Sequence, residues 1–477
     1  MKLTLLNLFL LFVGAINAQN NIDPTFGVKE LTADVEYFFT TLEEAHPNLY
    51  YYHTKDSVFR VKESIMRQLV SPMSRDNFNR LMELNTNHLF DGHTGLKRYF
   101  ERRTTIPDSA LLFPSNLISV EQGSIYFNEN SKRFKILSIN GLHSSKLIST
   151  MRSLIGDDQI TYIKDCTIED YFSTYFFHLY GSNNFYNLII EHDGDQRQLT
   201  LQGVLKKDLY TEDEIVPFAL NIQDDIALIT VNSFGLRYFK EFQVFLNNSI
   251  KQIRQANVKY LFIDISENSG GSSDNVNLLL DYLYPVDYCF LSGYATIRYS
   301  ERHLEDRRET FFIRYEDKEE AEKKYNLWKK SIESEYETGG GEWERIYNVD
   351  SPYLSKLFVL QSYKTFSASL DVSSAIKSSN RGLLIGEPTS DPAYNFSQAI
   401  GLEMPNTKIR FMCATGFYAM PSGSHNSKIG ILPDVYCHHK DLRAMKKDTD
   451  LLFNYFKSII TKYGDRQNAI EILKMFW

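Results

Sequence analysis

A regular alternation of buried strands and amphipathic helices in the second half of the chain most constrains the fold. Apolar runs span 226–231, 260–265, 356–360 and 383–385, with helical or turn-forming residues between them. Short continuous apolar runs are typical of strands buried on both faces. Strands joined by helices lie parallel in one sheet, because the crossover returns the chain to the same edge. From about residue 206, the sequence therefore predicts an α/β domain with a largely parallel sheet.

Two segments with different patterns of apolar residues precede this domain. Residues 30–100 repeat apolar residues at steps of three and four, beginning with Val35, Phe38 and Leu42, which favours helices. Residues 106–205 contain short β-like runs separated by turn dipeptides. The predicted organisation is a leader over 1–18, a helical module over 19–105, a β-rich module over 106–205, and an α/β core over 206–477 with a charged insertion at 290–350.

The insertion has a composition of its own. Residues 315–337 are rich in charged side chains and are followed by Gly339, Gly340 and Gly341. This pattern predicts an exposed helical arm on a flexible glycine hinge. The alternative is a lid over a cleft.

The first residues indicate export. Lys2 precedes an apolar run that reaches Ala15, and Ala18 offers a small residue at a cleavage point. The run is short for a membrane span, which needs roughly 20 apolar residues, so a signal peptide over 1–18 is favoured over an anchor. No other apolar run has membrane length. We expect a periplasmic or extracellular protein whose mature form does not insert into a membrane.

Composition limits the partners. The 477 residues include 52 Lys and Arg against 60 Asp and Glu, a net charge of −8, which argues against nucleic-acid binding.

His438 and His439 are adjacent, but side chains of an extended segment alternate in direction, so they are not expected to share a metal. We expect no metal or other cofactor, and the sequence does not indicate the oligomeric state. The cysteines lack zinc-ligand spacing and are expected to be free or structural; they are Cys166, Cys289, Cys413 and Cys437.

Ser367 is a candidate nucleophile. It follows the strand predicted at 356–360 and precedes a helix. A hydroxyl there lies near the positive end of the helix dipole, among backbone N–H groups without helical partners. Such donors would stabilise the oxyanion that forms when a nucleophile attacks a carbonyl. The alternative is that Ser367 or Ser369 only caps the helix.

A glycine-rich turn, 268–271, follows a different strand of the same sheet. The carboxyl ends of parallel strands share one edge, so this turn can approach Ser367. Glycine allows a backbone N–H to reach a substrate because it has no Cβ. Gly270 or Gly271, together with Ala368, would form a two-donor oxyanion hole. The alternative is a tight turn with no ligand.

Three stretches resemble the S41 peptidases, which include the carboxy-terminal processing (tail-specific) proteases and the tricorn protease core. Residues 264–271 resemble the family's D-L-R-x-N-x-G-G turn. Residues 365–369 resemble its nucleophile motif, and residues 380–389 end in a turn that resembles its G-E-x-T turn. Residues 429–434 resemble the G-[IV]-x-P-D motif that ends the family's pattern. The resemblance covers about 215–440. It implies a ClpP/crotonase-like sheet domain and a serine endopeptidase that hydrolyses peptides or protein C-terminal tails.

Weaker resemblances lie upstream. Residues 135–141 are similar to the I-L-x-I-N-G strand of a PDZ domain, a fold that captures peptide carboxyl ends by strand addition. Residues 30–100 resemble the helical N-terminal module of exported bacterial members. The resemblance thus implies a helical module and a PDZ-like module before the core.

The residue expected to act as the general base for Ser367 differs from that of the processing proteases. The Lys of their Ser/Lys dyad would fall on Pro392, and Ser266 replaces the Arg of the D-L-R motif. Tricorn-type members use a His from the region before the sheet domain, and His93 occupies a comparable place. A neutral imidazole is a suitable base near pH 7. The alternative is that His93 only braces its own glycine-flanked turn.

The acid that would orient His93 is not decided by sequence. The position of tricorn's Glu falls near Ser427 and Lys428, so Glu387 and Asp91 are the candidates. The favoured hypothesis is a serine peptidase that acts on peptide or protein substrates. The rival is an inactive S41-fold protein that binds peptides or apolar ligands, as in interphotoreceptor retinoid-binding proteins.

Overall fold

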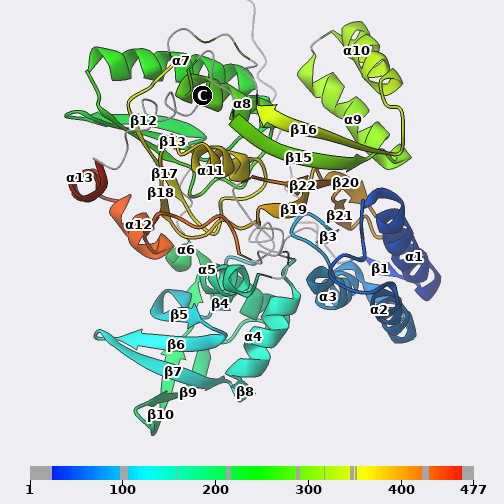
Figure 1. Cartoon of the computed structure of the whole chain (residues 1–477). Coiled ribbons are helices and arrows are strands. Elements are labelled where there is room, and N and C mark those ends of the chain that lie inside the picture. The colour runs from blue at the N-terminus through cyan, green and yellow to red at the C-terminus, as the bar shows by residue number, and fades with distance from the viewer. Residues whose placement is uncertain are drawn as a thin grey trace, which may run out of the picture.

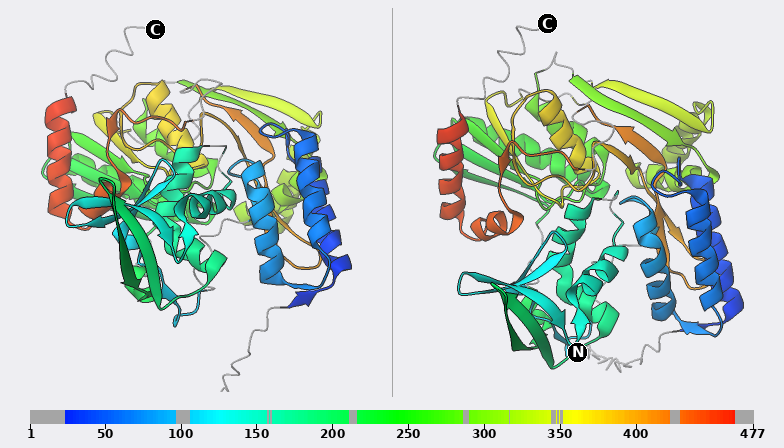
Figure 2. Two further views of the ribbon diagram at one scale, coloured as in Figure 1. Left: turned by 90° about the horizontal axis from the view of Figure 1, so that it is seen from below. Right: turned by 60° about the horizontal axis from the view of Figure 1, so that its bottom comes forward.

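The computed structural model describes residues 24–96, 106–156, 158, 160–210, 216–285, 290–315, 317–343, 347, 349, 352–421 and 429–464. The expected leader, Cys289, Ser427 and Lys428 lie outside these residues. Three regions are visible: an α/β core, a β-rich region and a group of N-terminal helices (Figure 1). The β-rich region and the N-terminal helices lie beside each other on the same side of the core (Figure 2).

The core contains a six-stranded sheet in the order β12-β13-β14-β17-β18-β23. Only β12 is antiparallel to its neighbour, and the other pairs are parallel. The predicted α/β class with a largely parallel sheet is therefore confirmed. The strands are β12 (Phe218–Gln223), β13 (Ile226–Val231), β14 (Tyr260–Asp264), β17 (Lys356–Gln361), β18 (Leu383–Gly386) and β23 (Val435–Tyr436).

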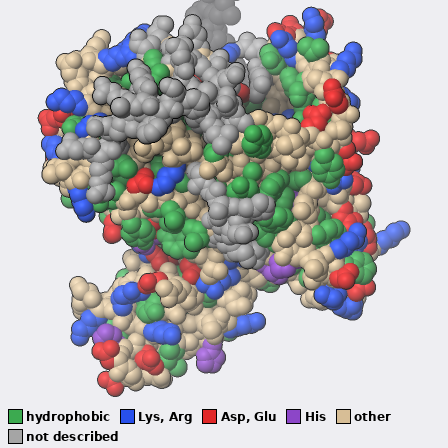
Figure 3. All heavy atoms as spheres, viewed as in Figure 1, with side chains coloured by type: hydrophobic (Ala, Val, Ile, Leu, Met, Phe, Trp, Pro, Cys, Tyr) green, Lys and Arg blue, Asp and Glu red, His purple; other side chains and the backbone are tan. Residues whose placement is uncertain are grey.

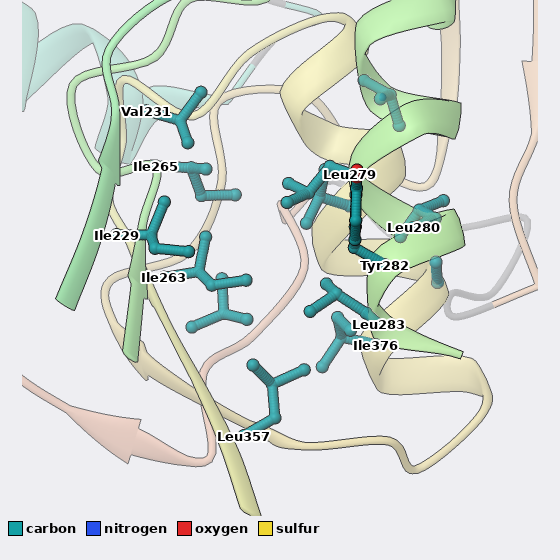
Figure 4. Close-up of a cluster of buried hydrophobic side chains, with 14 of the residues drawn as sticks. Ile229, Val231, Ile263, Ile265, Leu279, Leu280, Tyr282, Leu283, Leu357 and Ile376 are labelled. Carbon is teal, nitrogen blue, oxygen red and sulfur yellow. The ribbon is translucent and has the colours of Figure 1, made fainter. Parts of the chain in front are cut away.

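Helices cover both faces of this sheet, which explains why its strands are continuously apolar. On one face, Ile229 and Ile263 point toward Leu279 of α8 and Ile376 of α11 (Figure 4). On the other face, Phe262 stacks on Phe456 of α13, with ring centroids 3.9 Å apart. The first face carries α7 (Phe239–Gln255), α8 (Ser273–Leu283) and α11 (Ala368–Ser378), and the second carries α12 (His439–Met445) and α13 (Thr449–Tyr463).

The N-terminal helices share an apolar core with strands from the far end of the chain. Val35, Phe38 and Leu42 are fully buried, so the predicted stripe is confirmed. The helices are α1 (Val28–Ala45), α2 (Lys55–Gln68) and α3 (Arg75–Thr86). Their partners in this core lie in and beside β20 (Ile400–Glu403) and β21 (Arg410–Cys413), and β3 (Gly95–Leu96) pairs with β21. A short pair, β1 (Thr25–Phe26) and β2 (Met73–Ser74), joins the ends of α1 and α3.

The β-rich region is a sheet in the order β10-β9-β7-β6-β5, packed against two helices. The short β-like runs expected within 106–205 are present as strands. Its elements are β5 (Ile118–Glu121), β6 (Ser124–Glu129), β7 (Lys132–Ile139), β8 (Leu142–His143), α4 (Ser144–Ser153), α5 (Thr161–Tyr180), β9 (Phe185–His192) and β10 (Asp195–Gln202). The pair β4 (Leu111–Leu112) and β11 (Val204–Leu205), followed by α6 (Lys206–Leu209), links this region to the core.

The insertion is a two-stranded arm with a helical tip. Strands β15 (Phe290–Arg298) and β16 (Tyr336–Trp343) flank α9 (Glu301–Arg314) and α10 (Lys318–Lys330). Acidic and basic side chains intermix over this tip (Figure 3). The strands continue into a sheet of order β16-β15-β22-β19 with β22 (Gly416–Ala419) and β19 (Tyr394–Ser397).

The expected glycine hinge of this arm is wrong. Residues 339–341 lie inside β16 and pair with β15. At Gly340, where φ is 111°, a Cβ would lie 2.4 Å from the carbonyl oxygen of Gly293. The glycines therefore permit close approach of two strands, which sequence pattern alone does not distinguish from flexibility.

None of the helices that the structure describes is both long enough and apolar enough to cross a membrane.

Candidate active site

Ser367 has an unusual backbone at the start of α11. Its φ of 56° and ψ of −130° lie in a region that residues with a Cβ rarely adopt. Its N–H donates to Asp391 Oδ2 at 2.9 Å, and Asp391 is fully buried. The Ser367 hydroxyl makes no capping hydrogen bond within the described residues, whereas Ser369 Oγ accepts the N–H of Phe366 at 2.8 Å. Ser367 is therefore not a side-chain cap of α11, and its hydroxyl is available.

The glycine-rich turn lies directly against Ser367. A Cβ at Gly270 would lie 2.7 Å from Ser367 Cβ, so the close approach requires glycine. The N–H of Gly270 donates to Asn268 Oδ1 at 2.8 Å and is thereby occupied. The N–H groups of Gly271 and Ala368 meet no acceptor within the described residues. Of the three oxyanion-hole candidates, Gly271 and Ala368 are therefore the two with free donors.

A cavity of about 460 Å³ brings the site residues together. His93, Gly271, Ser367 and Ala368 all line it, although His93 is far from the others in sequence. Helix α9 of the insertion also contributes, through Asp306, Arg307 and Thr310, among others in the lining. The tip of the insertion thus forms part of the cavity wall, which agrees better with the lid alternative than with a detached arm.

His93 reaches this cavity because its segment is tied to the core. Strand β3 pairs with β21, and the N–H of Ala414 donates to Thr94 Oγ1 at 3.0 Å. The buried His93 ring stacks on Phe366, with centroids 4.2 Å apart and planes at 17°. His93 Nε2 lies 3.4 Å from Ser397 Oγ. The imidazole therefore packs on the residue that immediately precedes Ser367.

The Ser367 hydroxyl has no hydrogen-bond partner within the described residues, so His93 stands close by without being bonded to it. Catalytic hydrogen bonds are often long or poorly aligned before a substrate binds.

Asp91 contacts the His93 segment. Its Oδ1 accepts the backbone N–H of His93 at 2.8 Å, and its Oδ2 lies 3.0 Å from His46 Nε2. Burial acts to raise the pKa of Asp91, but the hydrogen bond with His46 and the nearby imidazoles outweigh it and lower the pKa. An ionised Asp91 therefore holds the turn on which His93 stands.

A second buried acid, Asp158, lies near Asp91 and Asp391. It accepts hydrogen bonds from the Tyr52 hydroxyl at 2.7 Å and from the N–H of Gly92 at 3.1 Å. Burial, and then the negative charges of Asp391 and Asp91, raise the pKa of Asp158 well above its usual range. Its neutral form is favoured, because that form is not repelled by the two other carboxylates.

Glu387, the other candidate orienting acid, lies elsewhere. Its carboxylate is 3.1 Å from His439 Nδ1, and His439 Nε2 is 3.5 Å from Asp170 Oδ1 on α5. Burial acts to lower the pKa of His439, but the hydrogen bonds to Asp170 and Glu387 outweigh it and raise the pKa to about 9. Glu387 thus belongs to an ion-pair network that joins α5 to α12.

His438 and His439 do not point to opposite sides, and this expectation is wrong. Their rings stack with centroids 4.4 Å apart, because His438 is the N-cap of α12 and His439 its first residue. Ligand atoms of Cys166, Glu387 and His439 lie within 4.8 Å of one another. Ligand atoms of Glu169, His438 and His439 also lie within 4.8 Å of one another, so this second cluster includes both histidines.

The three described cysteines, Cys166, Cys413 and Cys437, are buried free thiols.

Near Ser266, which replaces the motif's Arg, the residue that follows α12 supplies a cation. Lys446 Nζ lies 2.5 Å from Ser266 Oγ and 2.5 Å from Asp264 Oδ2. A positive charge therefore still neutralises Asp264 at the end of β14.

Sequence reasoning did not find Asp391, Phe366 or Ser397. Asp391 directly precedes Pro392, the position examined for a missing Lys, so its place beside the motif could have drawn attention to it. Ser397 and His93 are 304 residues apart in sequence, and no local pattern marks that contact.

Residues 225–437 match the model of Peptidase family S41. This segment belongs to peptidase family S41. The S41 segment contains Ser367, both glycines of the turn and Asp391, whereas His93 is supplied from outside it. The resemblance noted in the sequence is confirmed.

Solved structures share this architecture. Mature CPAF is 13% identical with a TM-score of 0.59, over 93% of this chain and 99% of that one. Mature CPAF complexed with lactacystin is 13% identical with a TM-score of 0.57, over 91% and 98%. At this identity the likeness concerns the fold alone, and it extends beyond the S41 segment to nearly the whole chain. The chain has no significant match among curated proteins.

Proposed function

We propose that this protein is a serine endopeptidase of the S41 type that hydrolyses peptides or protein C-terminal tails. Membership of the S41 segment supports peptide-bond hydrolysis. The observation that carries the proposal is the setting of Ser367: a strained residue whose free hydroxyl faces a cavity shared with His93. Backbone strain of this kind persists where the surrounding structure enforces it, and it clusters at active sites.

In the proposed mechanism, Ser367 Oγ attacks the scissile carbonyl while His93 accepts its proton. The N–H groups of Gly271 and Ala368 donate to the oxyanion of the tetrahedral intermediate. The intermediate collapses when His93 returns the proton to the leaving amine. Water, deprotonated by His93, then attacks the acyl-enzyme, and His93 returns the proton to Ser367 Oγ as the acyl–oxygen bond breaks. Asp91 positions His93 through its backbone and does not touch the reacting atoms.

The place of action that we propose is periplasmic or extracellular. The n-region, apolar run and small residues of 1–18 support export. Peptides released outside the cytoplasm would then be the substrates.

The test combines peptide cleavage with covalent labelling by a fluorophosphonate. Wild-type protein should cleave a peptide library and be labelled at Ser367. Ser367→Ala should abolish labelling, and both Ser367→Ala and His93→Ala should lower kcat/KM by at least about a thousandfold. His192→Ala, which changes a more exposed histidine of the β-rich region, is the matched control and should retain activity.

Two results would overturn the proposal. Cleavage that persists in Ser367→Ala would place the nucleophile elsewhere. A wild-type protein that neither cleaves nor labels, yet binds peptides, would be a receptor built on a peptidase fold.

A further inference from the structure

A second cavity, of about 450 Å³, adjoins the one that contains Ser367. The two share four lining residues, which are Asp371, Gln398, Tyr418 and Met420. A chain bound across Ser367 can therefore place one side chain in this second cavity. We call it the side pocket, and it is bounded by α8, α11 and the β15–β16 arm.

Several apolar side chains line the side pocket. Val276 and Leu280 come from α8, Ala375 from α11, and Ile297 from β15. Such walls suit a hydrocarbon stem. The methylene groups of a long side chain would be removed from water here, which is favourable at roughly 25 cal/mol per Å² of apolar area.

The charge in the side pocket has one sign. Among the described residues that line it, the charged side chains are Asp371 and Glu337, and no Lys, Arg or His is present. Glu337 Oε1 already accepts the N–H of Glu333 at 2.6 Å. The carboxyl group of Asp371 has no hydrogen bond or ion pair with any other described residue, and burial is the one cause of its raised pKa. The pocket therefore offers an uncompensated carboxylate to whatever enters it.

Asp371 lies in the first turn of α11, four residues after Ser367. Both residues line the Ser367 cavity, and Asp371 also lines the side pocket. Asp371 is half-buried, and burial raises its pKa to about 7. A carboxyl group that lacks a partner in such a place is costly to ionise, and a cation brought by a ligand would remove that cost.

We propose that the side pocket binds a Lys or Arg side chain of the substrate next to the scissile bond, and that Asp371 selects it. This inference rests on the proposed peptidase function and names its substrate class. The stem packs on the apolar walls while the ammonium or guanidinium group pairs with Asp371. An acidic side chain is rejected because two carboxylates face it.

Other charged groups lie in the Ser367 cavity and not in the side pocket. They are Asp274 of α8, and Asp306 and Arg307 of α9. Arg307 Nε points to His303 Nε2 at 3.2 Å, within its own helix. Asp274 is therefore a suitable control position, because it is a neighbouring acid that does not line the side pocket.

The experiment compares peptides that differ at one residue beside the cleaved bond, either Lys or its uncharged analogue norleucine. Wild-type protein should prefer Lys in kcat/KM by at least about tenfold at pH 8. Asp371→Asn should reduce this ratio to near one, whereas Asp274→Asn should keep it. In wild type, the ratio should fall as the pH is lowered through about 7, because Asp371 becomes protonated. Both peptides depend equally on His93, so their ratio isolates Asp371.

The outcomes separate the two proposals. If wild type cleaves neither peptide, the peptidase function fails. If wild type cleaves both equally well, or if Asp371→Asn keeps the preference for Lys, peptidase function stands and the side-pocket inference is overturned.

Discussion

At the scale of single residues, the site depends on backbone positions that exclude a Cβ. Gly270 lies against Ser367, and Gly271 lies against Phe234, whose carbonyl group would be 2.3 Å from a Cβ at position 271. The φ of Gly271 is 141°, which L side chains rarely adopt. Packing and backbone torsion therefore both require glycine at position 271, which lines the cavity.

Gly271→Ala should therefore destabilise the protein by about 2–4 kcal/mol and lower kcat/KM, because the turn must shift away from Phe234. Urea unfolding and peptide cleavage measure the two effects. Gly401→Ala is the matched control, since Gly401 is exposed and a Cβ there meets nothing within 4 Å. Equal behaviour of the two variants would show that the tight contact with Phe234 has no consequence.

At the scale of elements, the local sequence pattern predicted individual helices and strands better than the contacts between them. The buried runs of β13, β14 and β17 are continuously apolar because both faces of the sheet are covered, and α1 shows a clear stripe because only one face is buried. By contrast, β3 is two residues long and its partner β21 follows more than 300 positions later. A pairing of that kind has no local signature, so the position of His93 could be suggested only by resemblance.

The environment of Asp371 and the role of the glycines at 339–341 could likewise not be predicted from the local sequence. Asp371 looks like an ordinary polar position in the first turns of a helix, and its isolation becomes visible only when the β15–β16 arm is placed beside it. Residues 339–341 were misinterpreted because glycine serves both flexible loops and close strand contacts. His438 and His439 were misjudged because the extended segment assumed there is the start of a helix.

The contact between β3 and β21 can be tested by Thr94→Val. The substitution keeps the shape of the side chain but leaves the buried N–H of Ala414 without its acceptor. A loss of about 1–3 kcal/mol in the free energy of unfolding is expected, together with lower kcat/KM as His93 loses its support. Thr200→Val is the control, because Thr200 bonds Asn187 on an exposed strand. Identical stability and activity in both variants would argue against a role for this contact.

At the scale of the whole molecule, a network of charges ties the β-rich region to the core. Asp170 of α5 is contacted by His439 and Arg443 of α12 and by Lys364, and Arg443 also pairs with Glu267. Asp170 and His439 are buried, whereas Arg443 and Glu267 are about a third exposed, so salt screens the His439–Asp170 contact less than it would a surface pair. The relative position of the two regions is therefore sensitive to the charge on His439.

This sensitivity predicts a pH dependence of stability. The pKa of His439 is raised to about 9 in the folded protein, above its ordinary value of 6.5, so folding favours the protonated form. The stabilisation is present in full below pH 6.5 and is lost as the pH rises toward 9. Its size is at most about 3 kcal/mol.

Chemical unfolding of wild type at pH 6 and pH 9.5 should show this loss, and His439→Gln should reduce it. His192→Gln, at a more exposed imidazole, should behave as wild type. A stability difference between the two pH values that is unchanged in His439→Gln would assign the effect to other groups.

The pairing of β3 with β21 means that the His93 segment depends on a strand from the far end of the chain. The hydrogen bond from Ala414 to Thr94 adds a second contact between these two distant parts. A fragment that ends before β21 lacks both contacts. Under the proposed mechanism, such a fragment is expected to be inactive even though it contains both His93 and Ser367.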